Sequence, residues 1–115
     1  MSYFSAKSRH LRLGSKGERI AARLLRNKNY TILCRNFKVK SGEIDLVARD
    51  GENLVFIEVK TRRATTRSRP AEGLSSRQKK RIYHAAQNYL RQIDNPNVIY
   101  RFDLIEIILS RFKIH

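Results

Sequence analysis

This chain of 115 residues lacks most of the features that identify common protein classes. Its one cysteine, Cys34, excludes an internal disulfide framework. No apolar run approaches the roughly 20 residues of a transmembrane helix. The first residues lack the apolar core of a signal peptide, so we expect a cytoplasmic protein. The chain also contains no internal repeat and no glycine-rich phosphate loop.

Acidic residues are scarce as well, and this shortage points to a partner. Ten acids stand against 25 bases, which gives a formal net charge of +15. Self-repulsion of this size disfavours a compact state and is relieved when bound phosphates displace counterions. We therefore expect the partner to be a nucleic acid, with an anionic membrane surface as the weaker candidate.

Length and apolar content indicate a single domain. A chain of 115 residues that is 41% apolar is large enough for one core. We expect residues 1–14, which are basic and have no clear period, to form a mobile arm. Residues 15–109 would form the folded domain, and residues 110–115 a tail.

Local patterns predict two helices and four strands in the order α-β-β-β-α-β. An S-x-x-E motif at residues 15–18 predicts a helix that extends to about residue 28, and a similar motif at Ser75 begins the second helix. Apolar runs predict strands over residues 30–39, 43–49, 53–61 and 98–109. This order favours an α/β sandwich over a helical bundle.

The two central strands are expected to form a hairpin. Asp50-Gly51 lies between two apolar runs, and glycine tolerates the positive φ of a tight turn. If these two residues form the loop, Asp45 lies opposite Phe56.

The same hairpin would gather charged side chains on one face. Glu43 would lie opposite Glu58, and Lys60 would follow Glu58 on the same face, about 6.6 Å further along the strand. Asp45 would share that face, so two or three carboxylates would lie beside one ammonium group.

These carboxylates predict a metal ion. Residues 43–58 hold five of the ten acids and only one base, Arg49. Asp45 and Glu58 lie within apolar strands, where an unpaired carboxylate costs several kcal/mol or shifts its pKa upward. A divalent cation would compensate, and hard oxygen ligands favour Mg²⁺ or Mn²⁺ over Zn²⁺.

Glu18, on the inward side of the first helix, has two interpretations. It could cap the helix by reaching back to the backbone of Ser15. It could instead point at the acidic face of the hairpin, as a further ligand to the metal or to water.

Two basic groups are expected to contact phosphates. One follows the third strand, and the other crowds the first turns of the second helix, where cations conflict with the helix dipole unless an anion lies nearby. The two groups are Arg62, Arg63, Arg67 and Arg69, and Arg77, Lys79, Lys80 and Arg81. We expect Asp103 to neutralise a buried arginine or lysine.

Asp45 followed by Glu58-Val59-Lys60 across a hairpin resembles the PD-(D/E)xK nuclease superfamily, although Ile44 stands where that superfamily has proline. The segments GEIDLVARD, LVFIEVKTRR, PAEG and RFDLI closely resemble the YraN-like bacterial family assigned to that superfamily. The pair Gly17-Glu18 is also similar to archaeal Holliday-junction resolvases. Together the resemblance covers most of residues 15–107.

This resemblance implies a restriction-endonuclease-like core, with a mixed sheet of about four to five strands flanked by helices. It also implies a junction or branched-DNA substrate and allows a two-fold dimer. Asp45, Glu58, the Val59 carbonyl and Glu18 would hold Mg²⁺ or Mn²⁺ for phosphodiester hydrolysis, and Lys60 would orient or deprotonate the attacking water. The alternative is a DNA- or RNA-binding module that keeps the fold without turnover.

Overall fold

The computed structural model describes residues 2–64 and 73–110. In chain order the elements are α1 (Ser2–Asn27), β1 (Thr31–Val39), β2 (Gly42–Asp50), β3 (Asn53–Arg63), α2 (Ser76–Ile93) and β4 (Ile99–Leu109). The predicted α/β class and the α-β-β-β-α-β order are confirmed. Neither helix in this part of the chain combines the length and apolar character of a membrane span.

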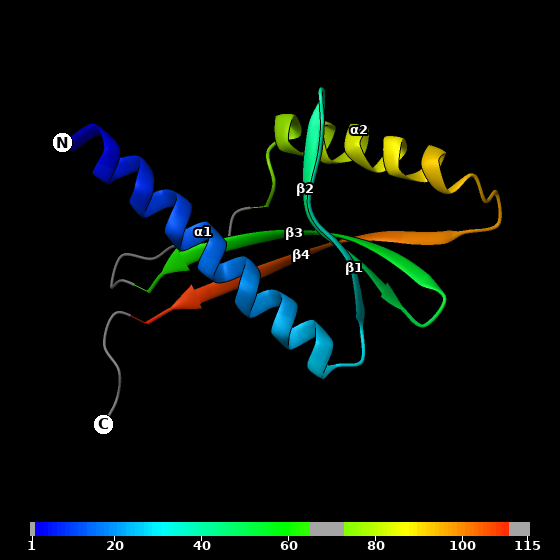
Figure 1. Cartoon of the computed structure of the whole chain (residues 1–115), viewed down its shortest axis with the longest axis horizontal. Coiled ribbons are helices and arrows are strands. Elements are labelled where there is room, and N and C mark those ends of the chain that lie inside the picture. Colours follow the sequence, from blue (N-terminus) through cyan, green and yellow to red (C-terminus); the bar gives the residue numbers. More distant parts are fainter. Residues whose placement is uncertain (1, 65–72, 111–115) are drawn as a thin grey trace.

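The four strands form one mixed sheet in the order β1-β2-β3-β4 (Figure 1). β1, β2 and β3 pair antiparallel as a meander, whereas β4 pairs parallel to β3. A parallel neighbour requires a crossover connection, and α2 lies in that connection. The sheet is therefore mixed, as expected.

The two helices cover opposite faces of the sheet, and each face has its own core. The six largest fully buried side chains all come from β2 and β3, because these central strands are covered on both faces. Burial of each such side chain stabilises the fold by about 1.5–3 kcal/mol. On the α1 side the buried residues are Ala21, Ala22, Leu25, Leu46, Ala48, Val55, Ile57, Val59 and Ile107. On the α2 side they are Ile44, Val47, Leu54, Phe56, Ile82, Ala85 and Ala86.

The predicted start of the first helix was wrong. α1 begins at Ser2, so residues 2–14 continue the helix and Ser15 lies inside it. The S-x-x-E motif caps a helix only where the chain is not already helical, and residues 2–13 contain no glycine or proline to end one. The second prediction was right. Ser75 caps α2 through a complete capping box with Gln78.

The predicted hairpin loop was wrong by one residue. Asp50 pairs with Asn53, so the loop is Gly51-Glu52, with Gly51 at φ 61°. Asp50 remains in the strand, where its carboxylate lies 3.2 Å from the Arg101 guanidinium of β4. Because the loop lies one residue later than predicted, each β2 residue lies opposite a β3 residue two positions later than expected.

Two glycines let elements approach each other closely. A Cβ at Gly17 of α1 would overlap the side chain of Thr61 on β3. A Cβ at Gly42, at the start of β2, would overlap the backbone of Arg81 in α2. Both positions therefore require glycine for steric reasons.

Replacing Gly17 with alanine should destabilise the fold by about 1–3 kcal/mol, because α1 must shift away from Thr61. Gly14→Ala is the matched control. A Cβ there meets nothing within 4 Å, so the helix should gain about 0.5–1 kcal/mol. Urea unfolding measures both changes. Equal stability of the two variants would contradict the close approach at Gly17.

Candidate active site at the split between two strands

β2 and β3 separate at Asp45. Their pairing runs from Asp50 opposite Asn53 to Leu46 opposite Ile57 and ends there. Two residues beyond Ile57 on β3, the N–H of Val59 donates to Oδ2 of Asp45 at 2.8 Å. The carboxylate of Asp45 therefore takes the place of a backbone acceptor where the ladder ends.

β2 also turns at this point. Side chains two residues apart normally share a face, yet Ile44 packs in the α2-side core and Leu46 in the α1-side core. Asn36, which lies between the β1 residues paired with these two, has a left-handed backbone with φ 53°. In Figure 1 the far end of the β1–β2 hairpin rises from β3 towards α2. The bend leaves the Asp45 side chain at the opening between the strands.

Glu58 lies across that opening. The observed register, continued by one pair, places it opposite Asp45 and corrects the expected pairings of Asp45 with Phe56 and of Glu58 with Glu43. Burial of Glu58, followed by its hydrogen bond to Asp45 and the charge of Asp45, raises the pKa of Glu58 to about 8. The Glu58 carboxyl thus keeps its proton to a higher pH than an ordinary glutamate does.

Lys60 belongs to the same group. It follows Glu58 by two residues, on the same side of β3, and its positive charge opposes the rise in the pKa of Glu58. Glu43 adds to that rise. The structure therefore brings together the three side chains predicted from the sequence: Asp45, Glu58 and Lys60.

Glu18 reaches Asp45 from α1. Burial raises the pKa of the Glu18 carboxyl, and the charge of Asp45 and a hydrogen bond with it add to that rise. Arg35 and Asn36 oppose it. Because α1 begins at Ser2, Glu18 does not cap the helix, and the interpretation in which it faces the acidic group is the one that fits. The close approach of neighbouring Gly17 to Thr61 places it there.

Comparison with known proteins identifies the family. A model described as "Uncharacterised protein family UPF0102" matches residues 17–107. The chain belongs to the UPF0102 family. A UPF0102 protein of Chlorobaculum tepidum is 46% identical over 96 residues, which are 84% of this chain and 74% of the relative.

Two further UPF0102 proteins match a similar length of this chain. One from Clostridium botulinum (strain Loch Maree) is 46% identical over 99 residues, covering 85% of this chain and 80% of the relative. One from Caldicellulosiruptor saccharolyticus is 36% identical over 98 residues, covering 85% and 83%. The family expected from the resemblance is thereby confirmed, and its matched region includes Glu18, Asp45, Glu58 and Lys60.

The donor set of this UPF0102 member fits a magnesium-type ion better than zinc. Among the residues that the structure describes, no three His, Cys, Asp or Glu side chains are grouped closely enough to hold a metal. Asp45 and Glu58 form a pair, with Glu18 against Asp45. Mg²⁺ is commonly bound by one or two carboxylates plus waters and substrate phosphates, whereas Zn²⁺ prefers His and Cys. The role of the Val59 carbonyl stays a prediction.

The predicted phosphate-binding residues divide into two groups. Arg62 lies 3.1 Å from Glu106 and Arg81 lies 3.6 Å from Glu43, so both are engaged in ion pairs within the fold. Their charges are partly neutralised within the fold, and their contact with phosphate stays a prediction. Four others are exposed, on the end of β3 and the first turns of α2: Arg63, Arg77, Lys79 and Lys80. Arg67 and Arg69 lie outside the described residues.

Asp103 pairs with an arginine, as expected, but that arginine, Arg101, is only partly buried. Its carboxylate accepts from Nε of Arg101 at 3.2 Å, and the same guanidinium contacts Asp50 and donates to the Tyr30 hydroxyl at 2.8 Å. This network joins β4 to β2 and to the start of β1 at the end of the sheet away from Lys60.

A cavity of about 510 Å³ lies beside Glu58 and was not predicted from the sequence. Its apolar lining comes from β3, β4, α2 and the segment before α2. The sequence pattern that could have indicated this cavity lies in β4, where the apolar Tyr100, Phe102 and Leu104 alternate with the polar Arg101 and Asp103. These three side chains are each more than 40% exposed.

Glu58→Gln should stabilise the protein at pH 9 and change little at pH 5. The contribution of the Glu58 proton to stability is complete below the ordinary pKa of 4.5 and is lost as the pH rises through about 8. Because the carboxyl is partly exposed, solvent screening limits the gain to about 1 kcal/mol, or roughly 4–8 °C in Tm. Thermal unfolding in EDTA at both pH values measures this.

Glu52→Gln, the same change in the exposed β2–β3 turn, is the control for that measurement. A difference that does not depend on pH, or an equal one in Glu52→Gln, would show that the fold does not raise the pKa of Glu58.

Proposed function

We propose that this UPF0102 member is a metal-dependent endonuclease of the PD-(D/E)xK superfamily, which hydrolyses phosphodiester bonds in structured or branched DNA. One observation carries the proposal. Asp45 and Glu58 face each other where β2 and β3 separate, with Lys60 beside them. A protein that only bound DNA would have no need of paired carboxylates next to phosphates, since like charges repel.

The electrostatics of the pair support a bound cation. Burial and the neighbouring Asp45 raise the pKa of Glu58, so the fold holds these two acids close together at a cost that a cation would remove. Asp45 and Glu58 would hold Mg²⁺ or Mn²⁺, with Glu18 and the Val59 carbonyl as further candidate ligands. When bound, such an ion polarises a phosphoryl oxygen and lowers the pKa of a coordinated water.

Lys60 would act on the reacting groups directly. Its ammonium carries three N–H donors and lies on the same side of β3 as Glu58. It would orient the attacking water and stabilise the negative charge that develops on the phosphate. The hydrogen bond from Val59 to Asp45 would hold the first carboxylate in place before a substrate binds.

The first turns of α2 would position the DNA backbone. Arg77, Lys79 and Lys80 are exposed there, with no acidic residue in the first turn. A homodimer belongs to the same proposal, because a branched substrate presents two strands and β4 is an edge strand that a second copy could pair with.

A second candidate is a nucleic-acid-binding module without useful turnover. The observation that favours it is that no group of three potential ligands is preformed among the described residues. The two candidates differ in cleavage, which the following measurement separates.

Purified protein with Mg²⁺ or Mn²⁺ should cleave single-stranded, supercoiled or four-way-junction DNA, and Lys60→Ala should lower the rate by at least about 100-fold. Lys40→Ala, which removes the same charge from the exposed β1–β2 turn, should keep the wild-type rate. Equal cleavage by wild type and Lys60→Ala would indicate a contaminating nuclease, and no cleavage by either would indicate a binding module.

Asp45→Asn should abolish metal binding while DNA affinity persists or rises, because a carboxylate that repels phosphate is removed. Asparagine keeps an oxygen that can accept from the Val59 N–H, so the fold should survive. Titration calorimetry with Mn²⁺ measures uptake, and fluorescence anisotropy measures DNA binding. Unchanged Mn²⁺ uptake in this variant would refute the assignment of Asp45 as a ligand.

A further inference from the structure

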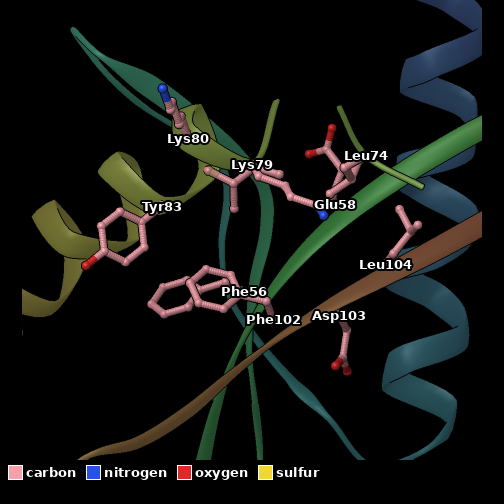
Figure 2. A pocket seen from close by; sticks show the side chains of 10 residues that line it. Phe56, Glu58, Leu74, Lys79, Lys80, Tyr83, Phe102, Asp103 and Leu104 are labelled. Carbon is pink, nitrogen blue, oxygen red and sulfur yellow. The ribbon is translucent and has the colours of Figure 1, made fainter. Parts of the chain in front are cut away.

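The cavity beside Glu58 exists because α2 covers only part of its face of the sheet. α2 packs mainly on β2 and β1, and β4 stays exposed on that face, where Phe102 and Leu104 are each more than 40% exposed. In Figure 2, Phe56 and Phe102 lie side by side on β3 and β4, with Tyr83 facing them from α2. The space between has a volume of about 510 Å³, which is within the range of small-molecule sites.

The walls of the cavity are aromatic and aliphatic. The Phe56 and Phe102 rings are 5.4 Å apart between centroids and tilted by 32°. Phe56 is fully buried, whereas Phe102 is 45% and Tyr83 52% exposed. Leu74 and Leu104 complete the apolar lining. A flat apolar ring could therefore enter and contact Phe102 and Tyr83 without displacing the core.

The rim of the cavity carries both acidic and basic side chains. Glu58, one of the two carboxyls of the candidate active site, forms part of the lining. Lys79 and Lys80 of α2 also line it, and Figure 2 shows Lys79 extending towards β3 and Lys80 pointing outward. The Asp103 carboxylate is turned away from the rings towards Arg101. The apolar cavity therefore lies next to the cationic side chains of α2 and next to the candidate metal site.

We propose that this cavity receives an unpaired nucleobase from the nucleotide next to the scissile phosphate. The inference rests on the proposed nuclease function and specifies its substrate as DNA with at least one unpaired nucleotide at the cleavage site. A nucleobase supplies a flat π surface for Phe102 and Tyr83, and its phosphates supply the negative charge that Lys79 and Lys80 attract.

A fully paired duplex fits this cavity poorly. Its bases are stacked inside the helix, so one would have to be extruded at a cost of a few kcal/mol. A mismatched, bulged or single-stranded nucleotide avoids most of that cost. A second copy of this chain is the other candidate occupant of an apolar surface, but two copies would bring their cationic rims together. Lys79 and Lys80, which would repel their copies and attract phosphates, therefore favour a nucleotide.

The test compares two DNAs that differ only in the base. One duplex carries a single unpaired nucleotide, and the other carries an abasic site at the same position. In EDTA, wild type should bind the base-containing DNA about 10-fold more tightly, as expected for one base stacked on aromatic side chains. Phe102→Ala should lose this preference, whereas its affinity for the abasic DNA should stay the same.

Tyr100→Ala is the matched control, because Tyr100 is a similarly exposed aromatic residue on the same side of β4 and does not line the cavity. It should keep the preference for the base. Lys79→Ala should weaken binding of both DNAs alike, as expected for a phosphate contact. Thermal unfolding of each variant establishes that it is folded.

The outcomes separate this inference from the proposed nuclease function. Cleavage of these DNAs with Mg²⁺, without any preference for the base over the abasic site in binding, would overturn the base pocket and leave the nuclease in place. A base preference without cleavage would support the pocket and overturn the nuclease. A dimer in sedimentation that Phe102→Ala dissociates, with DNA binding unchanged, would assign the surface to self-association and overturn the pocket.

Discussion

The candidate site depends on the hydrogen bond from the Val59 N–H to the Asp45 carboxylate. A strand that leaves its neighbour exposes backbone groups that must find another partner, and a buried amide without one costs about 1–3 kcal/mol. Asp45 supplies the acceptor at that point. The same hydrogen bond keeps Asp45 close to Glu58, because Glu58 immediately precedes Val59 in the chain.

The surrounding elements keep the two acids close in spite of their repulsion. Gly42 lets the end of the β1–β2 hairpin lie directly on α2, and Gly17 lets α1 lie directly on β3. The first contact fixes the bend of β2, and the second brings Glu18 to Asp45. A cation placed among these oxygens would convert an unfavourable arrangement into a binding site, which is the physical basis of the nuclease proposal.

Much of the fold could be predicted from local sequence. Apolar periodicity gave both helices and all four strands in the right order, and the capping box at Ser75 was read correctly. Two local signals were misleading. The S-x-x-E motif did not start α1, because the preceding residues also form helix. Asp50-Gly51 was not the loop: Asp50 pairs with Asn53 and stays in β2, where its carboxylate lies 3.2 Å from Arg101, 51 residues later in the chain.

The sequence by itself determined the strand order along the chain, the family, and the spacing that puts Glu58 and Lys60 on one side of a strand. These follow from alternation and from short motifs, which act over a few residues. Only the tertiary structure decided that Asp45 faces Glu58, that Glu18 reaches Asp45 and that an open apolar cavity lies beside them. Each of these depends on how far a strand bends or a helix extends over a sheet, and such distances are set by packing between residues far apart in the chain.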